Sequence, residues 1–322
     1  MSKEWIEVLP DRLEAGTIVM VTVAHVEGSA PRDAGTTFLV SSHEAWGTIG
    51  GGHLEFEAIR HARAAIALAA PVELKRYALG PSLGQCCGGV VWLLYEVILP
   101  GERGAWVQRR AQWQAGGWLS RRIRSTDKRS SWTCARGVER VQFSVQGEAW
   151  EYAQGFARSP FPIFVFGAGH VGEAITQALA PLSSDIVWID SREDAFPPVR
   201  IPGIDTRWPD DPVQEVAAAP TNTWFLVLTH SHDLDLSLAT AILARADFAF
   251  FGLIGSKSKR ARFEHRLAAR GLDCSRMVCP IGIPGITGKA PATIAVAVAA
   301  QLVQSREALP SLVATEALET HG

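Results

Sequence analysis

The sequence has little cysteine, no long apolar run and almost no net charge. Its 322 residues include five cysteines, and this odd, sparse number excludes a disulfide scaffold and favours a reducing compartment, the cytoplasm. No uninterrupted apolar segment reaches the roughly 18–20 residues of a membrane-spanning helix, and Met1–Trp5 lacks the apolar core of a secretory leader. The formal net charge is -2, which argues against a globally basic nucleic-acid binder. We therefore expect no membrane and no nucleic-acid partner.

The composition is that of a globular protein with a large core. Hydrophobic residues make up 47% of the chain and charged residues 20%, which excludes disorder of the whole chain. The length predicts about two domains. Residues 153–162 are rich in glycine, proline and small side chains, as is typical of a linker. We predict one domain over residues 1–155 and a second over residues 156–322.

The first predicted domain mixes helices and strands. Helices are expected at Trp5–Ala15 and Leu54–Leu68, and strands at Thr17–Val26, Thr37–Ser41 and Val90–Leu99. The second helix is amphipathic, with an apolar face formed by Leu54, Ala58, Ala62 and Ala65. The pattern predicts a smaller, N-terminal α+β domain.

Strands and helices alternate in the second predicted domain. Strands are expected at Pro162–Phe166, Asp185–Ile189, Trp224–Thr229 and Phe248–Gly252, and helices at Val171–Ala180, Leu236–Ala246, Lys257–Arg270 and Pro291–Gln304. Such alternation predicts a parallel sheet with helices on both faces. The fold class is therefore α/β, with a C-terminal Rossmann-like doubly wound sheet.

A glycine motif, GAGHVG, follows the first strand of this domain. Gly167 permits a tight turn, Gly169 lets the backbone approach a diphosphate, and Gly172 lets helix and strand pack closely. His170 directly precedes the expected helix, whose N-terminus supplies free N–H groups and a partial positive charge for an anion. Asp190 ends the next strand, 18 residues after Gly172, near the usual ribose-binding position. We predict a Rossmann fold and leave open whether a dinucleotide binds, because such folds often change their ligand.

Other polar residues follow later strands of the same domain. His230 and His232 stand with Asp233 just beyond a strand, at the edge where parallel sheets bind ligands. They could bind a metal or relay protons, or they could simply cap the next helix. Lys289 ends a glycine-rich loop that lacks the spacing of a phosphate loop, and it could contact an anion or only shape the loop.

Two glycine-rich loops carry the candidate site of the first domain. Gly50, Gly51 and Gly52 lead into a helix, and three successive glycines allow a backbone nest or a close ligand approach. Cys86 and Cys87 are adjacent and are followed by two glycines, a setting more typical of exposed thiols than of a core. A thiolate is a soft ligand for a metal or for sulfur, and a structural cysteine pair is the alternative.

The segment from Arg103 to Arg140 is strongly basic, with ten basic residues and two acidic ones. It could face an acidic partner. Most such runs are solvated faces of helices and hairpins, and we favour that interpretation.

The order of these motifs resembles the XdhC/CoxI family. The resemblance rests on Gly28–Arg32, Gly47–Glu55, Gln85–Gly89, Phe166–Gly172, Thr229–His232, Gly252–Ser256 with Lys259, Arg262 and Phe263, and Cys279–Lys289, and it spans about residues 10–305. Seven motifs in one order are far more specific than any one alone. The chain departs from the family pattern at Ala290, where an acid is expected, and at Ala297, where a small hydroxyl residue is expected.

The resemblance implies a binding protein more than a turnover enzyme. Such a protein binds the molybdenum cofactor in its molybdopterin form while a cysteine desulfurase supplies the sulfido ligand. It then delivers the cofactor to apo xanthine dehydrogenase or a related molybdenum hydroxylase. Carriers of this kind often dimerise, so a homodimer is compatible with the resemblance.

The resemblance also implies roles for the candidate residues. Cys86 and Cys87 would lie near molybdenum or its sulfido ligand. The glycines Gly50–Gly52 and Gly167–Gly172 would hold the phosphate or the pterin. His230 and His232 would line a crevice, and Lys289 would supply a counter-charge.

Two other functions stay open from the residues alone. A nicotinamide-dependent oxidoreductase would bind NAD(P) with Asp190 on the ribose, although the sequence has no Tyr-x-x-x-Lys pattern to donate a proton. A metal-binding regulatory protein would use His230, His232 and the cysteines.

Overall fold

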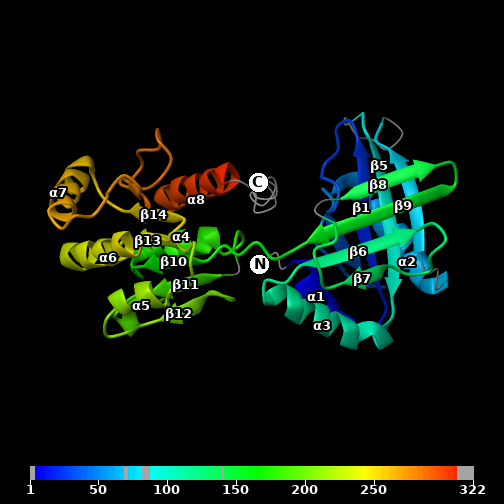
Figure 1. Ribbon diagram of the computed structural model, residues 1–322, viewed down its shortest axis with the longest axis horizontal. Coiled ribbons are helices and arrows are strands. Elements are labelled where there is room, and N and C mark those ends of the chain that lie inside the picture. Colours follow the sequence, from blue (N-terminus) through cyan, green and yellow to red (C-terminus); the bar gives the residue numbers. More distant parts are fainter. Residues whose placement is uncertain (1–3, 69–71, 81–87, 139–140, 184, 310–322) are drawn as a thin grey trace, which may run out of the picture. The chain divides into compact units, whose positions relative to one another are not determined.

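The structure is a computed structural model that describes residues 4–68, 72–80, 88–138, 141–183 and 185–309. The chain divides into two compact units, one ending at Ser159 and one beginning at Pro160. In Figure 1 the first runs from blue to green and the second from green to red. Each unit has its own hydrophobic core residues, so each is described by itself.

The N-terminal unit contains two antiparallel sheets. The larger has the strand order β3-β2-β1-β5-β4, formed by β1 Ile18–Glu27, β2 Thr37–Val40, β3 Ala45–Trp46, β4 Val72–Ala78 and β5 Val90–Ile98. The smaller has the order β7-β6-β9-β8, formed by β6 Leu119–Arg124, β7 Ser131–Thr133, β8 Gln142–Gln146 and β9 Ala149–Phe156. The helices are α1 Trp5–Arg12, α2 Gly52–Leu68 and α3 Arg103–Gln114.

Both faces of the larger sheet are covered. Helix α2 packs on one face, and its buried residues Leu54, Ala58, Ala62 and Ala65 confirm the predicted apolar face. Because successive side chains of a strand point to opposite faces, Val21 of β1 packs with α2 while Met20 packs with Trp106 of α3. Farther along β1, Ala24 packs against Tyr152 of the smaller sheet.

The C-terminal unit is a six-stranded parallel sheet with the order β12-β11-β10-β13-β14-β15. Its strands are β10 Ile163–Phe166, β11 Ile186–Ile189, β12 Asp205–Arg207, β13 Trp224–Val227, β14 Phe250–Leu253 and β15 Met277–Val278. Its helices are α4 His170–Leu179, α5 Val213–Ala218, α6 His232–Arg245, α7 Lys257–Ala268 and α8 Pro291–Ala308. Counted from β10, this is the order 3-2-1-4-5-6 of the Rossmann fold, and it confirms the predicted fold class.

Helices cover both faces of the parallel sheet (Figure 1). Phe164 and Phe166 of β10 pack in the core that includes residues of α5, α6 and α7. The alternating residues Ile163 and Val165 pack in the core that includes residues of α4 and α8. A sheet buried on both faces explains why its strands read as continuous apolar runs in the sequence.

Several boundaries differ from the sequence-based expectation. Helix α1 ends at Arg12, before the predicted Ala15. Strand β13 ends at Val227, and α6 begins at His232 because the Ser231 hydroxyl accepts a hydrogen bond from the Leu234 N–H at 3.3 Å. In the described part of the chain, no helix has the length and apolarity needed to cross a membrane.

Candidate functional site

The predicted residues of the C-terminal unit meet at the carboxyl ends of its strands. A narrow crevice is lined by Phe166, Gly167, Ile189, Asp190, Ser191, Pro212, Thr229, His230 and Leu234. It includes the ends of β10 and β13, neighbours between which the winding of the sheet reverses. In open α/β sheets, ligands bind at this switch point. Three predicted residues, Gly167, Asp190 and His230, line it together.

Each glycine of the GAGHVG turn has a distinct steric role. Gly167 has φ +118°, and a Cβ there would stand 2.5 Å from the Leu228 carbonyl oxygen. A Cβ on Gly172 would overlap the Gly167 carbonyl oxygen. A Cβ on Gly169 would meet no atom within 4 Å, so the space above this residue is open. These are the three roles that the motif predicts, and the open one is where a diphosphate would approach.

The Asp190 carboxylate accepts hydrogen bonds from two residues of neighbouring segments, Ala168 and Arg192. Its Oδ2 accepts hydrogen bonds from the Ala168 N–H at 2.9 Å and from Arg192 Nη2 at 3.1 Å. Its Oδ1 accepts from the Arg192 N–H at 3.1 Å and from Arg192 Nε at 3.0 Å. Burial raises the pKa of Asp190, but these hydrogen bonds outweigh it, so the pKa lies below its ordinary value.

A buried network holds the turn that carries His230. Thr229 donates to Asp235 Oδ1 through its N–H at 3.1 Å and through its hydroxyl at 2.7 Å. Lys259 Nζ donates to Asp235 Oδ2 at 2.6 Å and to the Ile254 carbonyl at 2.8 Å. The turn after β13 is therefore tied to α6, α7 and the end of β14. Lys259 belongs to the motifs that carry the family resemblance, although no role was assigned to it from the sequence. Asp235 was not predicted, although a charged residue four positions after Ser231 on an otherwise apolar helix face was a usable signal.

The remaining predicted residues of this unit lie apart from the crevice lining. His170 and His232 are the exposed first residues of α4 and α6. Lys289 is exposed in the loop before α8. Among the described residues, no group of three or more His, Cys, Asp or Glu is placed to hold a metal ion. The ligand roles of these residues stay predictions.

Three glycine-rich loops of the N-terminal unit converge at one end of its larger sheet. A Cβ on Gly89 would overlap the Ser29 carbonyl oxygen, and Gly28, at φ +71°, lies against Gly89 in return. A Cβ on Gly50 would overlap Pro31. The turn at 28–31 therefore contacts both the loop that starts α2 and the loop that follows the cysteine pair. Cys86 and Cys87 themselves lie outside the described residues, so their predicted role stays a prediction.

The Gly50–Gly52 turn already holds an anion of its own. Glu55 Oε2 accepts the Ile49 N–H at 2.9 Å and the Gly51 N–H at 3.1 Å, together with the Thr48 hydroxyl at 2.5 Å. An outside anion would have to displace this carboxylate from these two amides. A Cβ on Gly51 would meet no atom within 4 Å, so close approach by a ligand is the role that stays open for this glycine.

Comparison with known proteins finds a family match in each of the two units. Residues 163–302 match the family model described as the XdhC Rossmann domain, and residues 12–78 match the model described as the XdhC and CoxI family. The chain belongs to the XdhC and CoxI family. The match covers the Rossmann unit from β10 into α8 and the N-terminal unit from α1 to β4.

One solved structure is similar along almost the whole chain. A xanthine dehydrogenase from Bacillus halodurans superposes with a TM-score of 0.78 at 19% identity, covering 96% of this chain and 97% of that chain. At this identity, the similarity shows a common fold alone. No curated protein matches the sequence.

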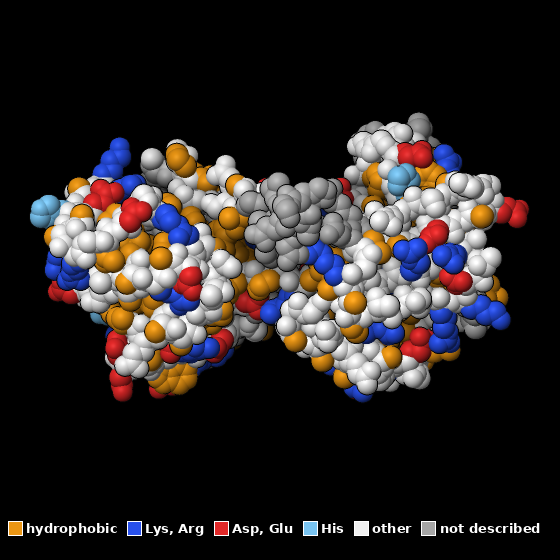
Figure 2. Space-filling model, viewed as in Figure 1, with side chains coloured by type: hydrophobic (Ala, Val, Ile, Leu, Met, Phe, Trp, Pro, Cys, Tyr) orange, Lys and Arg blue, Asp and Glu red, His pale blue; other side chains and the backbone are white. Residues whose placement is uncertain are grey.

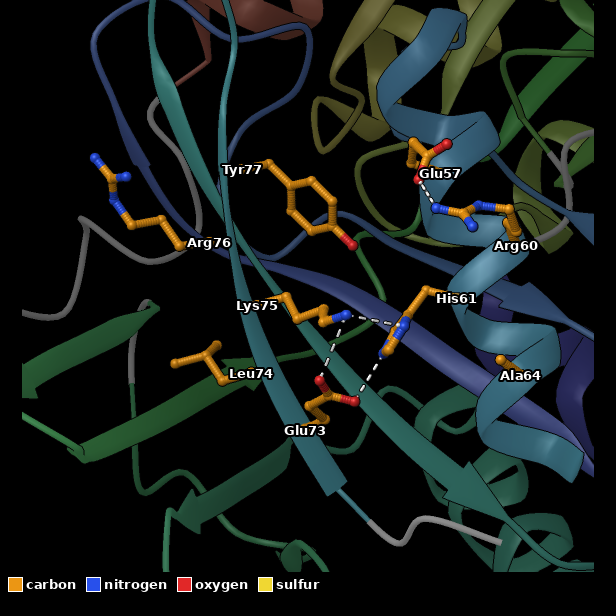
Figure 3. Close-up of a pocket in the computed structure, with 9 residues that line it drawn as sticks. All are labelled: Glu57, Arg60, His61, Ala64, Glu73, Leu74, Lys75, Arg76 and Tyr77. Carbon is orange, nitrogen blue, oxygen red and sulfur yellow. Dashed lines mark hydrogen bonds and ion pairs between the residues drawn. The ribbon is translucent and has the colours of Figure 1, made fainter. Parts of the chain in front are cut away.

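This member of the XdhC and CoxI family has a further groove between α2 and β4 that the sequence did not predict (Figure 3). It encloses about 630 Å³ and is lined by Glu57, Arg60, His61, Ala64, Glu73, Leu74, Lys75, Arg76 and Tyr77. His61 lies between two charges, with Nε2 2.7 Å from Glu73 Oε2 and Nδ1 3.1 Å from Lys75 Nζ. Because the Lys75 ammonium can only donate, Nδ1 is the acceptor and Nε2–H donates to Glu73.

The groove had a readable signal in the sequence. Glu73, Lys75 and Tyr77 alternate along β4 and point toward α2 in Figure 3, and Glu57 and His61 lie one turn apart on that helix. Glu57 also pairs with Arg60. A polar period-two segment beside an amphipathic helix marks a half-exposed edge strand.

The basic residues of this segment that the structure describes are exposed or partly exposed, apart from Arg121. On the face shown in Figure 2, Lys and Arg side chains are interspersed with Asp and Glu. Arg121 of β6, however, is 1% exposed and forms an ion pair with Glu96 of β5 at 2.6 Å. Its burial follows from position rather than composition, because inward-facing residues of β6 lie between the two sheets.

Proposed function

We propose that the chain is an accessory protein of xanthine dehydrogenase maturation that carries the molybdenum cofactor in its molybdopterin form. Membership of the XdhC and CoxI family favours the accessory role. The cofactor is cargo: it is bound, protected and then released to the apoenzyme. On this proposal a cysteine desulfurase supplies the sulfido ligand while the cofactor is held.

The observation that carries the proposal is the convergence of loops in the N-terminal unit. Gly28, Gly50 and Gly89 are each required by close backbone or proline contacts. Gly88 directly follows the cysteine pair in the sequence, is exposed, and would tolerate a Cβ without contact within 4 Å. Packing therefore fixes Gly89, two residues after a cysteine pair in the sequence, and thiols are the soft ligands that molybdenum and sulfur favour.

The test is cofactor retention by the full chain purified from molybdenum-replete cells. We expect close to one molybdenum and one oxidised-pterin fluorophore per chain. Cys86→Ser with Cys87→Ser should lower both by about tenfold and abolish activation of apo xanthine dehydrogenase. Cys134→Ser is the matched control, because Cys134 is an exposed free thiol of the same unit. Absence of pterin and of activation with the unaltered chain would contradict the proposal.

A second pair of variants tests the loop contact itself. Gly89→Ala places a methyl group on the Ser29 carbonyl and should lower retention, whereas Gly101→Ala meets no atom within 4 Å and should not. Equal retention by both would show that the Gly28–Gly89 contact does not contribute to cofactor retention.

The oxidoreductase alternative needs a nucleotide in the Rossmann crevice. The glycine turn offers the open space that a diphosphate requires, but the carboxylate that would bind the ribose, Asp190, already accepts four hydrogen bonds from its own chain.

A further inference from the structure

A Rossmann carboxylate binds ribose by accepting hydrogen bonds from its hydroxyls. Two carboxylate oxygens offer about four lone-pair directions, and Asp190 uses four: one for the Ala168 N–H and three for Arg192. The Asp190 side chain is only 4% exposed. No lone pair is left to receive a ribose 2′- or 3′-hydroxyl.

Arg192 occupies the acceptor atoms that a bound ribose would use. Its Nε and Nη2 donate to the two oxygens of Asp190, the same pair of acceptors that a ribose diol would use. The bond set is charge-assisted and bidentate, which makes it stronger than an ordinary neutral pair. The Arg192 side chain is 45% exposed, so it can leave if something replaces it.

The charge around this guanidinium does not favour a phosphorylated ribose either. Asp194 raises the pKa of Arg192 through its negative charge, after the larger effects of Asp190. Glu193 is its neighbour in the same short helical turn. A 2′-phosphate brought to Arg192 would meet these carboxylates, so the site is poor for NADP as well as for NAD.

We propose that Arg192 is an internal substitute for the ribose and closes the Rossmann crevice of this chain to nicotinamide dinucleotides. The glycine turn of the fold is retained, but Asp190, the carboxylate that would bind the ribose, already pairs with Arg192 two residues further along the chain. Arg192 is thus a specificity-determining residue, and its removal opens the crevice. This inference is independent of the proposed cofactor cargo.

The test is a gain of binding. The full chain is titrated with NAD⁺ and, separately, with NADP⁺ by isothermal calorimetry. We expect a Kd for NAD⁺ of about 1 mM or weaker for the unaltered chain. Arg192→Ala frees two acceptor positions on Asp190 and should bind NAD⁺ about tenfold more tightly, the worth of one charge-assisted hydrogen bond.

Further variants assign the gain to the carboxylate. Arg192→Ala combined with Asp190→Asn should lose the gain, because an amide presents only one acceptor oxygen. Arg192→Lys, which keeps the charge with a single donor group, should fall between the two. Arg200→Ala is the matched control, because Arg200 lies over the Phe196 and Trp208 rings and not on the carboxylate.

The outcomes separate cleanly. Micromolar binding of NAD⁺ or NADP⁺ by the unaltered chain would overturn the proposal, as would unchanged affinity in Arg192→Ala with an unchanged melting temperature. If Arg192→Ala melts early, Arg192→Lys decides in its place. Cofactor retention measured on the same variants keeps failure of this inference distinct from failure of the proposed function.

Discussion

Both units bury an ion pair, and the two pairs differ in what surrounds them. In the N-terminal unit, Arg121 and Glu96 are 0% and 3% exposed and 2.6 Å apart. In the C-terminal unit, Lys259 and Asp235 are 8% and 1% exposed, also 2.6 Å apart. The pairs are alike in length and burial, so the difference lies in their partners.

The Arg121 pair joins two sheets. Arg121 also donates to Thr22 at 2.8 Å and to Gln154 at 2.8 and 3.1 Å, and Ser130 donates to Glu96. Every one of these groups is structural. The Lys259 pair instead shares Asp235 with Thr229, the residue before His230 at the crevice. A buried ion pair thus joins two sheets in the N-terminal unit, whereas in the C-terminal unit a similar pair positions the turn that carries a candidate ligand residue.

The largest expected effect is in the N-terminal unit. Arg121→Leu leaves Glu96 charged and buried with only part of its hydrogen bonds, and should lower the free energy of unfolding by about 3–5 kcal/mol. Urea unfolding followed by tryptophan fluorescence measures it. Adding Glu96→Leu should restore much of the loss, because it removes the orphaned charge. A loss below about 1 kcal/mol would mean that water reaches the site.

Lys259→Met should lower the free energy of unfolding less than Arg121→Leu does, but it should also disturb the turn at Thr229 and His230. Asp235 keeps two hydrogen bonds from Thr229, so we expect a loss of about 2–3 kcal/mol. Amide hydrogen exchange should also quicken at Thr229 and His230. The Arg121→Leu chain provides the control, since its exchange at these amides should be unaltered. Unchanged exchange in Lys259→Met would show that the pair does not position the turn.

Asp190 predicts a smaller, pH-dependent effect. Its pKa is lowered in the folded chain, so its contribution is present above the unfolded value of about 3.9 and is lost as the pH falls through the folded value. Between pH 5 and pH 2, Asp190→Asn should therefore lose stability less steeply than the unaltered chain, as about pH 4 is passed. Unfolding midpoints over this range measure it, and parallel slopes would contradict it.

The smallest effect concerns the exposed counterpart of the buried pairs. Glu73 and Lys75 are each 39% exposed and lie 3.6 Å apart. Glu73→Gln keeps the shape of the side chain and should cost less than about 1 kcal/mol. A loss as large as that of Lys259→Met would show that the groove behind His61 is more enclosed than its exposure indicates.

Local sequence patterns predicted those helices, strands and turns whose own residues carry a clear apolar period or glycine spacing. The apolar runs of β10, β11, β13 and β14 and the GAGHVG turn predicted the Rossmann order, because strands buried on both faces admit few polar residues. The face of α2 was predicted because the helix period alone places its four buried residues together. The short β12 and β15 carry no such pattern and pair only because a neighbouring strand is present. Strand β4 carries the period-two pattern of an edge strand, but no strand was predicted there.

The candidate site divides in the same way. Gly167, Gly169, Gly172 and Asp190 were predicted from spacing, and the structure brings them to one edge of the sheet. The partner of Asp190 was not predicted, since Arg192 differs in no way from other surface arginines in the sequence. The groove of Figure 3 was missed because it needs α2 and β4 together.

The amino-acid sequence on its own determined the family, the doubly wound sheet and the glycine turns, because these depend on short-range periodicity and on backbone angles that only glycine adopts readily. Folding in three dimensions decided which charges are buried and which acceptors are already in use. Those properties depend on the side chains that segments far apart in the chain bring within hydrogen-bond distance, and no local spacing encodes that distance.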